Sequence, residues 1–312
     1  MVGRDPKGMD QMNLAQLVDP THTEDVKLVR AREELRAALA PVRREGCSVG
    51  LVPTMGYLHE GHLSLLRAAR AECDVVVMSL FVNPAQFGPG EDLDRYPRDE
   101  ERDLRLAGEA GADFVWAPPV EEVYPEGFAT HVAVEGLTEI LCGDPSRRGP
   151  EHFRGVTTVV AKLFNSVQPD VAYFGQKDAQ QAVAIKRMVR DLDFPVRIEL
   201  LPIVREADGL AMSSRNAYLD PRAREQATAL SRALRAAEEV ALAGGIPAAL
   251  GAARAELRTA GVEPEYLEAC DAEDLTPVAE LGDRPILIAV AAQIGGARLI
   301  DNVLVKPSTD ER

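Results

Sequence analysis

The 312-residue sequence predicts an α/β fold, with a doubly wound, parallel-sheet, Rossmann-like domain followed by a smaller α+β domain. Two observations support this prediction. Short β-rich apolar runs alternate with stretches of helical apolar spacing through the first two thirds of the chain, and after Val204 helical stretches precede a set of strand-like runs. Hydrophobic residues make up 46% of the chain and charged residues 27%, which supplies enough apolar side chains for a substantial core.

The first two thirds carry five strand-like runs that are apolar almost throughout, as strands buried on both faces are. They cover residues 48–53, 74–82, 113–117, 170–174 and 196–201. Between them, apolar residues recur near helical spacing over 63–73, 99–110, 156–167 and 179–192. Continuous apolar strands separated by helices indicate a parallel sheet covered on both faces, whose ligands bind beyond the carboxyl ends of the strands.

The pattern changes near Val204. A polar loop over 205–216 leads into an Ala-, Arg- and Glu-rich helical stretch over 221–243, and Gly244-Gly245 interrupts it before a second helix near 247–260. Strand-like runs follow at 266–270, 285–292 and 297–305. We therefore expect a flexible tail over residues 1–24, a nucleotide-binding Rossmann-like domain over 25–203, and a small α+β lid domain over 204–312.

Charge and cysteine content limit the classes of partner and compartment. The formal net charge of −15 argues against general binding of nucleic acid, because a phosphate backbone would meet a repulsive field. No apolar run approaches the roughly 20 residues needed to span a bilayer, and the first 25 residues lack the apolar segment of a secretory signal. The four cysteines are scattered without a Cys-x-x-Cys pair, which favours reduced thiols in the cytoplasm.

The most informative motif, Pro53-Thr54-Met55-Gly56-Tyr57-Leu58-His59-Glu60-Gly61-His62, comes directly after the first of these strands. It places two of the five histidines at the entrance to a helix, where unpaired N–H groups and the positive dipole end suit a phosphate. Gly61 lets a ligand approach the backbone closely. His59 and His62 could donate hydrogen bonds to phosphate oxygens as negative charge builds up on them.

Three other interpretations of this motif compete with phosphate binding. The histidines could be incidental to a helix cap. His-x-x-His can also bind zinc, although no third Cys or His ligand lies nearby in the sequence. A Rossmann dinucleotide site is excluded, because the pattern Gly-x-Gly-x-x-Gly is absent.

Two amides follow the second predicted strand. Asn83 and Gln86 stand where that strand ends, and uncharged amides there can hydrogen-bond a substrate hydroxyl or carboxylate without adding charge. The alternative is that both amides pair with the loop backbone.

A third group of polar residues follows a later strand. Gly175, Lys177 and Asp178 come after the apolar run 170–174. Lys177 is a compact cation suited to a phosphate, and Asp178 could accept from a ribose or orient the lysine. A solvated Lys–Asp pair is the alternative. Gln181 lies three residues beyond Asp178, so one helix face would point both into the same crevice.

The polar loop that follows Val204 contains Met212-Ser213-Ser214-Arg215. Hydroxyls, backbone N–H groups and one cation can surround a triphosphate, and Arg215 can bind it in bidentate fashion. Ser213 and Ser214 could also cap a helix, and the two roles are compatible.

His-x-Gly-His after a first strand is the signature of the nucleotidylyltransferase superfamily, and further segments narrow the resemblance. Taken in order with that motif, they resemble the pantothenate synthetase family over about residues 25 to 305. These segments are Phe81–Pro89, Glu91–Arg98, His152–Val156, Tyr173–Gln181 and Arg205–Asn216.

The resemblance implies ATP-dependent condensation of pantoate with β-alanine through a pantoyl-adenylate, with release of AMP and pyrophosphate. It further implies Mg²⁺ as cofactor, a homodimer, and a place in coenzyme A (vitamin B5) biosynthesis. It implies that His59, His62, Lys177 and Arg215 are catalytic, and that Asn83, Gln86 and Gln181 bind pantoate or β-alanine. The ATP site it implies comprises Thr54, Met55, Gly56, His59, Gly61, His62, Gly175, Lys177, Asp178, Val204, Met212, Ser213, Ser214 and Arg215. Neither the magnesium ligands nor a base for the β-alanine amine follow from it.

The sequence departs from the family pattern at a few positions. Tyr57 stands where a small residue is common, and Gln176 stands where glutamate is frequent. Gln293 and Gly296-Ala297 replace the usual arginine and threonines. The stretch 144–150 is about a residue longer than usual, so the family's arginine there corresponds to either Arg147 or Arg148.

Two other functions stay open on sequence alone. A related nucleotidylyltransferase would stop at a nucleotidyl adduct of a small molecule. A degenerate nucleotide-binding sensor would lack at least one of His59, His62, Lys177 and Arg215, and all four are present.

Overall fold

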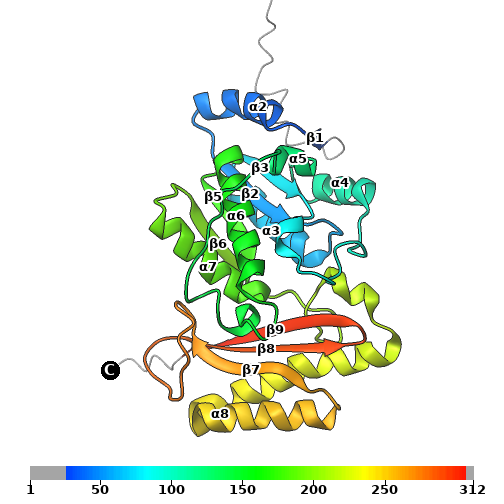
Figure 1. The fold of residues 1–312 in the computed structure, drawn as a ribbon, viewed down its shortest axis with the longest axis vertical. Coiled ribbons are helices and arrows are strands. Elements are labelled where there is room, and N and C mark those ends of the chain that lie inside the picture. The colour runs from blue at the N-terminus through cyan, green and yellow to red at the C-terminus, as the bar shows by residue number, and fades with distance from the viewer. Residues whose placement is uncertain (1–25, 307–312) are drawn as a thin grey trace, which may run out of the picture.

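A computed structural model describes residues 26–306 of the chain. The predicted tail over 1–24 lies outside the described residues. Figure 1 shows a parallel sheet with helices on its faces and, at the other end of the molecule, a second sheet covered by a long helix. The first sheet has six strands in the order β1-β4-β3-β2-β5-β6, all parallel. Their bounds are β1 Lys27–Val29, β2 Val49–Thr54, β3 Val75–Leu80, β4 Phe114–Trp116, β5 Val171–Gly175 and β6 Arg197–Leu201.

Helices cover both faces of this sheet, because alternate residues of its strands enter two different cores. Val75 and Val77 of β3 pack in one core, whereas Val76 and Met78 pack in the other. The first core contains residues of α2 (Arg32–Arg44), α6 (Pro150–Val167) and α7 (Ala179–Asp191), and the second contains residues of α3 (Glu60–Glu72) and α4 (Glu100–Glu109). The doubly wound α/β architecture predicted from the sequence is confirmed.

The strand order positions a ligand crevice. From β2 the chain moves outward to β3 and β4, and then returns through α6 to place β5 on the other side of β2. The direction of winding therefore reverses between β2 and β5. In open α/β sheets ligands bind beyond the carboxyl ends of the strands at such a point. Thr54 ends β2 and Gly175 ends β5, so the two predicted motifs that follow them meet there.

The second sheet is antiparallel, in the order β7-β8-β9, with bounds Pro264–Asp271, Ile286–Ile294 and Ala297–Val305. One of its faces packs on α8 (Pro221–Thr259) through residues such as Ile288 and Val290. The other face contributes Leu287 and Ala289 to the core that lies under α6. The predicted small α+β unit is therefore present, and it shares a core with the first sheet.

The helix α8 breaks where the sequence predicts an interruption. Gly245 has φ 77° and ψ 175°, which only glycine adopts readily, so two helical segments meet there. By length and composition alone, α8 is apolar enough to cross a membrane. Its buried residues, among them Ile246, Ala249 and Leu257, pack in the core against the antiparallel sheet.

The described structure adds elements that the sequence patterns did not predict. The edge strand β1 pairs with β4, and α2 follows it directly. The helix α6 begins at Pro150 rather than near Val156. Short turns complete the chain: α5 (Val120–Val123) and the 3₁₀ helices η1 (Pro84–Gln86), η2 (Leu141–Gly143), η3 (Gln176–Asp178) and η4 (Ser214–Tyr218).

Candidate active site

A cavity of about 220 Å³ lies at the predicted crevice, beyond the ends of β2, β3 and β5. Every predicted site residue except Gly56 lines it. These are Thr54, Met55, His59, Gly61, His62, Asn83, Gln86, Gly175, Lys177, Asp178, Gln181, Val204, Met212, Ser213, Ser214 and Arg215. Residues from separate segments of the sequence are thus brought to one cavity.

Gly56 shapes the turn after β2 and does not line the cavity. Its φ of 86° is in the left-handed region, and a Cβ built on it would lie 2.5 Å from Leu80 Cδ1. The buried Asp103 carboxylate fixes this turn by accepting from the backbone N–H groups of Tyr57 and Leu58, each at 2.7 Å. The glycine is therefore needed for the path of the chain that carries the histidines.

His59 and His62 stack at the first turn of α3, with ring centroids 4.1 Å apart and an angle of 29° between the planes. His62 Nδ1 accepts the backbone N–H of His59 at 3.4 Å, so the proton of its neutral ring is on Nε2. His59 Nδ1 is buried without a partner among the described residues. A Cβ at Gly61 would lie 2.9 Å from the His59 ring, so this glycine makes room for the imidazole.

Both imidazoles are neutral at physiological pH. Burial, together with the Lys177 cation, lowers the pKa of His59 to about 4. Burial also lowers the pKa of His62 well below its ordinary value, with His59 and Lys177 acting in the same direction. The pair therefore offers N–H donors at a helix N-terminus rather than two fixed positive charges.

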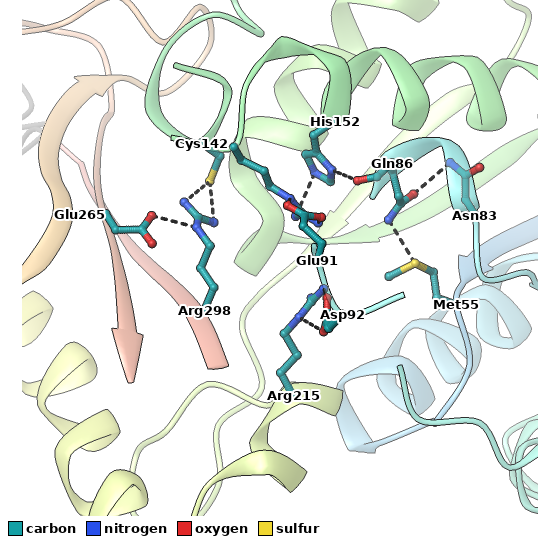
Figure 2. A network of polar contacts seen from close by, with 11 residues as sticks. Met55, Asn83, Gln86, Glu91, Asp92, Cys142, His152, Arg215, Glu265 and Arg298 are labelled. Carbon is teal, nitrogen blue, oxygen red and sulfur yellow. Dashed lines mark hydrogen bonds and ion pairs between the residues drawn. The ribbon is translucent and has the colours of Figure 1, made fainter. Parts of the chain in front are cut away.

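Asn83 and Gln86 form a connected amide pair beside Met55 (Figure 2). Asn83 Nδ2 donates to Gln86 Oε1 at 3.2 Å, and Gln86 Nε2 donates to Met55 Sδ at 3.1 Å. The Gln86 N–H₂ group thus faces a weak acceptor on the cavity wall. A substrate oxygen at that place would be a better partner for it.

His152 holds the backbone of the same short turn. Its Nδ1 lies 2.8 Å from the carbonyl oxygen of Gln86, which can only accept, so Nδ1 carries the proton. Nε2 is then free to accept from Arg148 Nη1 at 3.3 Å. Burial and the neighbouring Arg148 cation lower the pKa of His152 to about 3, which keeps the ring neutral.

The structure separates the two arginines between which the sequence could not choose. Arg148 lines the cavity and pairs in bidentate fashion with Glu91, at 2.8 Å for both bonds. Arg147 turns toward the antiparallel sheet, where it pairs with Glu268 at 2.7 Å and stacks on Tyr266. Arg148 is therefore the one that belongs to the site.

Arg215 is already engaged by a carboxylate. Its Nε and Nη2 donate to Asp92 at 2.9 and 3.0 Å (Figure 2), and its guanidinium lies 5.6 Å from the centre of the Tyr96 ring. Ser213 caps η4 by accepting the N–H of Arg215, and Ser214 donates to the carbonyl of Tyr57 at 3.2 Å. The segment 212–215 is thus in contact with the turn that precedes the histidines.

Lys177 and Asp178 stand in η3, directly after β5. Neither side chain forms an ion pair with any residue between 26 and 306. Asn302 of β9 donates to the carbonyl oxygens of Gln176 and Lys177, each at 3.0 Å, so the antiparallel sheet supports this turn from behind. Gln181 lines the cavity one turn further along α7.

Cationic side chains line the cavity, although the chain as a whole is acidic. Among residues 26–306 these are Lys177, Arg148 and Arg215, and the two arginines are each paired with a carboxylate of the neighbouring loop, Glu91 and Asp92. With the neutral histidines at the N-terminus of α3, this suits a polyphosphate bound next to a group recognised by amides. Within residues 26–306 no group of three or more His, Cys, Asp or Glu side chains could hold a metal ion, which disfavours the zinc interpretation of His59 and His62.

Sequence reasoning missed two residues that complete the site and left a third undecided. Tyr96 and His152 line the cavity and stand inside motifs that carried the family resemblance, and Arg148 lines it beside them. The position of Tyr96 and His152 inside those motifs is the sequence feature that points to them as site residues. The roles of Arg148 and His152, however, depend on contacts with Glu91 and Gln86, which lie far from them in sequence.

Comparison with known proteins agrees with this geometry. The sequence model of the family described as pantoate-beta-alanine ligase matches residues 27–304. A pantothenate synthetase of Moorella thermoacetica is 57% identical over 285 residues, covering 90% of this chain and 99% of its own length. That of Thermotoga petrophila is 50% identical over 285 residues, covering 90% of this chain and all of its own.

Solved structures give the same result. The crystal structure of pantothenate synthetase from Thermus thermophilus is 53% identical, with a TM-score of 0.84, and the alignment covers 90% of this chain and 100% of that one. A pantoate-beta-alanine ligase from Francisella tularensis, complexed with beta-gamma ATP and beta-alanine, is 30% identical with a TM-score of 0.74, covering 90% and 98%. The resemblance seen in the motifs is confirmed.

Proposed function

The chain belongs to the pantoate–β-alanine ligase family and catalyses the ATP-dependent condensation of pantoate with β-alanine, and we propose that it does so through a pantoyl-adenylate formed in the cavity described above. The observation that carries this proposal is the meeting of two kinds of group in one cavity. Helix-terminal donors and cations suit the phosphates of ATP, and uncharged amides suit a small hydroxy acid.

In the first step, a pantoate carboxylate oxygen attacks the α-phosphorus of ATP. The bond from that phosphorus to the bridging oxygen breaks, and pyrophosphate leaves with the electron pair. His59, His62, Lys177 and Arg215 stabilise the charge on the phosphates, while Gln86 and Gln181 hold pantoate. The protein's contribution is positioning and electrostatic stabilisation, which suits a cavity that offers donors rather than a nucleophile.

In the second step, the neutral amine of β-alanine attacks the acyl carbon of the mixed anhydride. The bond between that carbon and the bridging oxygen breaks, AMP leaves with the oxygen, and the amine loses a proton to become the amide. Arg148 lines the cavity close to His152 and Gln86, and its positive charge attracts anionic groups. We assign it to attracting the β-alanine carboxylate or the departing phosphates.

We propose that Mg²⁺ arrives with ATP. Magnesium in nucleotide sites is usually held by one or two carboxylates together with substrate phosphates, rather than by an all-protein cage. The cavity fits this arrangement, because Asp178 lines it without an ion-pair partner among the described residues. When bound, the ion offsets the negative charge of the phosphates, and Asp178 is the side chain best placed to hold it.

We also propose that the enzyme is a cytoplasmic homodimer, as the family resemblance implies. Cys47, Cys73, Cys142 and Cys270 are all free thiols, which suits a reducing compartment. Light scattering coupled to size-exclusion chromatography would give the mass of the particle. A mass of one chain at micromolar concentration would contradict the dimer.

The proposal is tested by measuring AMP in the presence of ATP and Mg²⁺. AMP release should require pantoate, and multiple turnovers should also require β-alanine, with pantothenate as product. A related nucleotidylyltransferase would instead accumulate a stable nucleotidyl adduct that β-alanine does not consume. That outcome, or AMP release without pantoate, would contradict the two-step ligase mechanism.

A further inference from the structure

Tyr124 lies outside the cavity but is bonded to the amide pair that faces it. It follows α5, and its ring packs against Phe81 and Phe128. Its hydroxyl donates to Asn83 Oδ1 at 2.8 Å. Burial raises the pKa of Tyr124 to about 12, so the phenol keeps its proton and remains a donor throughout the physiological range.

Asn83 has no hydrogen-bonding capacity left for a substrate. Oδ1 accepts from the Tyr124 hydroxyl and from the Ala85 N–H at 3.3 Å, while Nδ2 donates to Gln86 Oε1 and to the Gly155 carbonyl at 3.1 Å. The residue is 1% exposed. All of its strong donor and acceptor positions are therefore occupied within the protein. Although Asn83 borders the cavity, its contacts are those of a support for Gln86.

The orientation of the Asn83 amide is set by two backbone partners, one of which can only donate and the other only accept a hydrogen bond. The N–H of Ala85 can only donate and the carbonyl of Gly155 can only accept, so oxygen and nitrogen of the amide are unambiguous. It follows that Gln86 must present Oε1 to Asn83. Its N–H₂ group is then directed at Met55 and the cavity.

The short turn that carries Gln86 is clamped by α6. A Cβ added to Gly155 would lie 2.2 Å from the carbonyl oxygen of Ala85, so helix and turn are in direct backbone contact. His152, one turn earlier on α6, bonds the Gln86 carbonyl. With the backbone fixed in this way, the remaining freedom of Gln86 is the rotation of its amide. The bond from Asn83 restricts that rotation.

We propose that Tyr124 is a positioning residue of the ligase reaction, which acts through Asn83 to hold Gln86 with its N–H₂ group toward pantoate. The inference rests on the proposed role of Gln86 as a pantoate ligand. The Tyr124 bond is the shortest of the four that hold Asn83, at 2.8 Å against 3.1 to 3.3 Å for the others. Without it, Ala85 and Gly155 still fix which way the Asn83 amide faces, but the amide is held less tightly. The bond from Asn83 that restricts the rotation of the Gln86 amide is then weaker, and Gln86 presents its N–H₂ group to pantoate for a smaller share of the time.

The test is the steady-state kinetics of Tyr124→Phe in the full-length enzyme, with each substrate varied in turn. Loss of one hydrogen bond that orients a binding group should raise KM for pantoate by about three- to tenfold. KM for ATP and kcat should stay within about twofold. The matched control is Tyr173→Phe, which removes the hydroxyl of another buried tyrosine. That hydroxyl donates to Glu72 at 2.7 Å and does not line the cavity. This variant should leave pantoate KM unchanged.

A second variant uses the same logic without touching the tyrosine. Asn83→Asp replaces the N–H₂ group by an oxygen of the same size, so Gln86 Oε1 and the Gly155 carbonyl both face another acceptor. The Gly155 carbonyl belongs to the backbone of α6 and cannot turn, so the Gln86 amide should reverse. We expect at least a tenfold rise in pantoate KM. This variant keeps the inference testable if Tyr124→Phe proves too unstable to purify.

A double-mutant comparison separates failure of the inference from failure of the proposed function. In a Gln86→Ala background, Tyr124→Phe should have no further effect on pantoate KM, because the residue through which it acts is gone. The positioning role alone would be overturned if Tyr124→Phe changed pantoate KM by the same factor in both backgrounds. It would also be overturned if Gln86→Ala raised pantoate KM while Tyr124→Phe and Asn83→Asp left it unchanged. If Gln86→Ala itself leaves pantoate KM unchanged, the proposed assignment of Gln86 fails.

Discussion

At the first turn of α3, burial and Lys177 remove the charge from the two histidines. A neutral imidazole with Nδ1 occupied presents one N–H through Nε2, and for His62 the occupying partner is the backbone N–H of His59. A donor of this kind costs little to bury and gains strength as charge develops on a phosphate oxygen. The charge itself is left to Lys177, Arg148 and Arg215.

His62→Ala should therefore lower kcat by about 10²-fold or more, the scale seen when one transition-state donor is removed. His62→Gln is the informative partner variant, because its Nε2 can reach the place of the imidazole Nε2 and it should retain more activity than the alanine variant. The measurement is kcat from AMP release at saturating substrates. A kcat within a few-fold of wild type for His62→Ala would refute the donor role.

His152 makes stability depend on pH in a defined direction. Its pKa is about 3 in the folded protein against an ordinary value of 6.5, so the unfolded chain takes up a proton more readily. The stability contributed by the neutral ring is complete above about pH 6.5 and is lost progressively as the pH falls toward 3. His152→Asn retains an N–H near the position of Nδ1 but does not titrate. Its melting temperature should fall less between pH 7 and pH 5 than that of wild type. The measurement is calorimetry without ligands. Equal falls in the melting temperatures of the variant and wild type would contradict the role of His152 in the pH dependence.

At the scale of elements, the sequence predicts well those strands and helices that a local hydrophobic pattern determines. The central strands β2, β3 and β5 are apolar almost throughout, and the structure places each within two residues of the predicted bounds. The helix α2 was missed, although Leu35, Leu39 and Val42 are buried at helical spacing, because Pro41 interrupts the pattern. The strand β1 has only three residues and is defined by pairing with β4, which no local pattern reveals.

The site likewise combines features that local sequence predicts with contacts that it does not. Motifs after β2, β3 and β5 converge because the parallel topology brings strand ends together, and this could be predicted. The partners of those motifs could not. Tyr124 reaches Asn83 across 41 positions, and Asp92 reaches Arg215 across 123, so nothing in either local pattern indicates the contact.

The loop between β3 and α4 holds both cavity arginines through adjacent carboxylates. Glu91 pairs with Arg148 and Asp92 with Arg215, and the Arg215–Asp92 pair is mostly shielded, with side-chain exposures of 21% and 14%. If Arg215 binds the triphosphate, ATP must compete with Asp92 for the same guanidinium. On the proposed roles, this loop therefore keeps both arginines paired with its own carboxylates until ATP displaces them.

Asp92→Asn should accordingly lower KM for ATP by about twofold or more, because a mostly shielded ion pair that no longer competes is worth at least as much as an exposed one. Asp94→Asn is the matched control. It makes the same change of net charge in the same loop, at an exposed residue without an ion pair among the described residues. A higher ATP KM in Asp92→Asn alone would mean that Asp92 orients Arg215 for the phosphate instead of competing with it.

At the scale of the whole molecule, the two cations proposed to bind the phosphates come from different parts of the chain. Lys177 follows β5 of the first sheet, and Arg215 lies beyond the predicted boundary near Val204. The antiparallel sheet buries Leu287 and Ala289 in the core of the first domain, so we do not expect it to swing freely as a lid. The lid role that the sequence predicts for residues 204–312 is better assigned to the segment 205–218, which contacts the first domain through side-chain bonds of Ser214, Arg215 and Tyr218.

If this segment is a lid, weakening it should let water hydrolyse the intermediate. Closure shields the acyl-adenylate from water, so Arg215→Ala should both slow adenylate formation and release more AMP than pantothenate. Lys177→Ala should slow the first step without that excess, because Lys177 does not tether the segment. The measurement is the ratio of AMP to pantothenate at saturating β-alanine. A ratio of one in the Arg215 variant would leave Arg215 as a phosphate ligand only.

The central claim, that one cavity activates pantoate as an adenylate, is tested most directly by the fate of the carboxylate oxygens. With pantoate labelled by ¹⁸O in both carboxylate oxygens, attack on the α-phosphorus and later release of AMP transfer one labelled oxygen to the nucleotide. Mass spectrometry should therefore find one ¹⁸O in each AMP and one in each pantothenate. AMP without label, formed at the same rate as pantothenate, would contradict the adenylate and with it the account of the site.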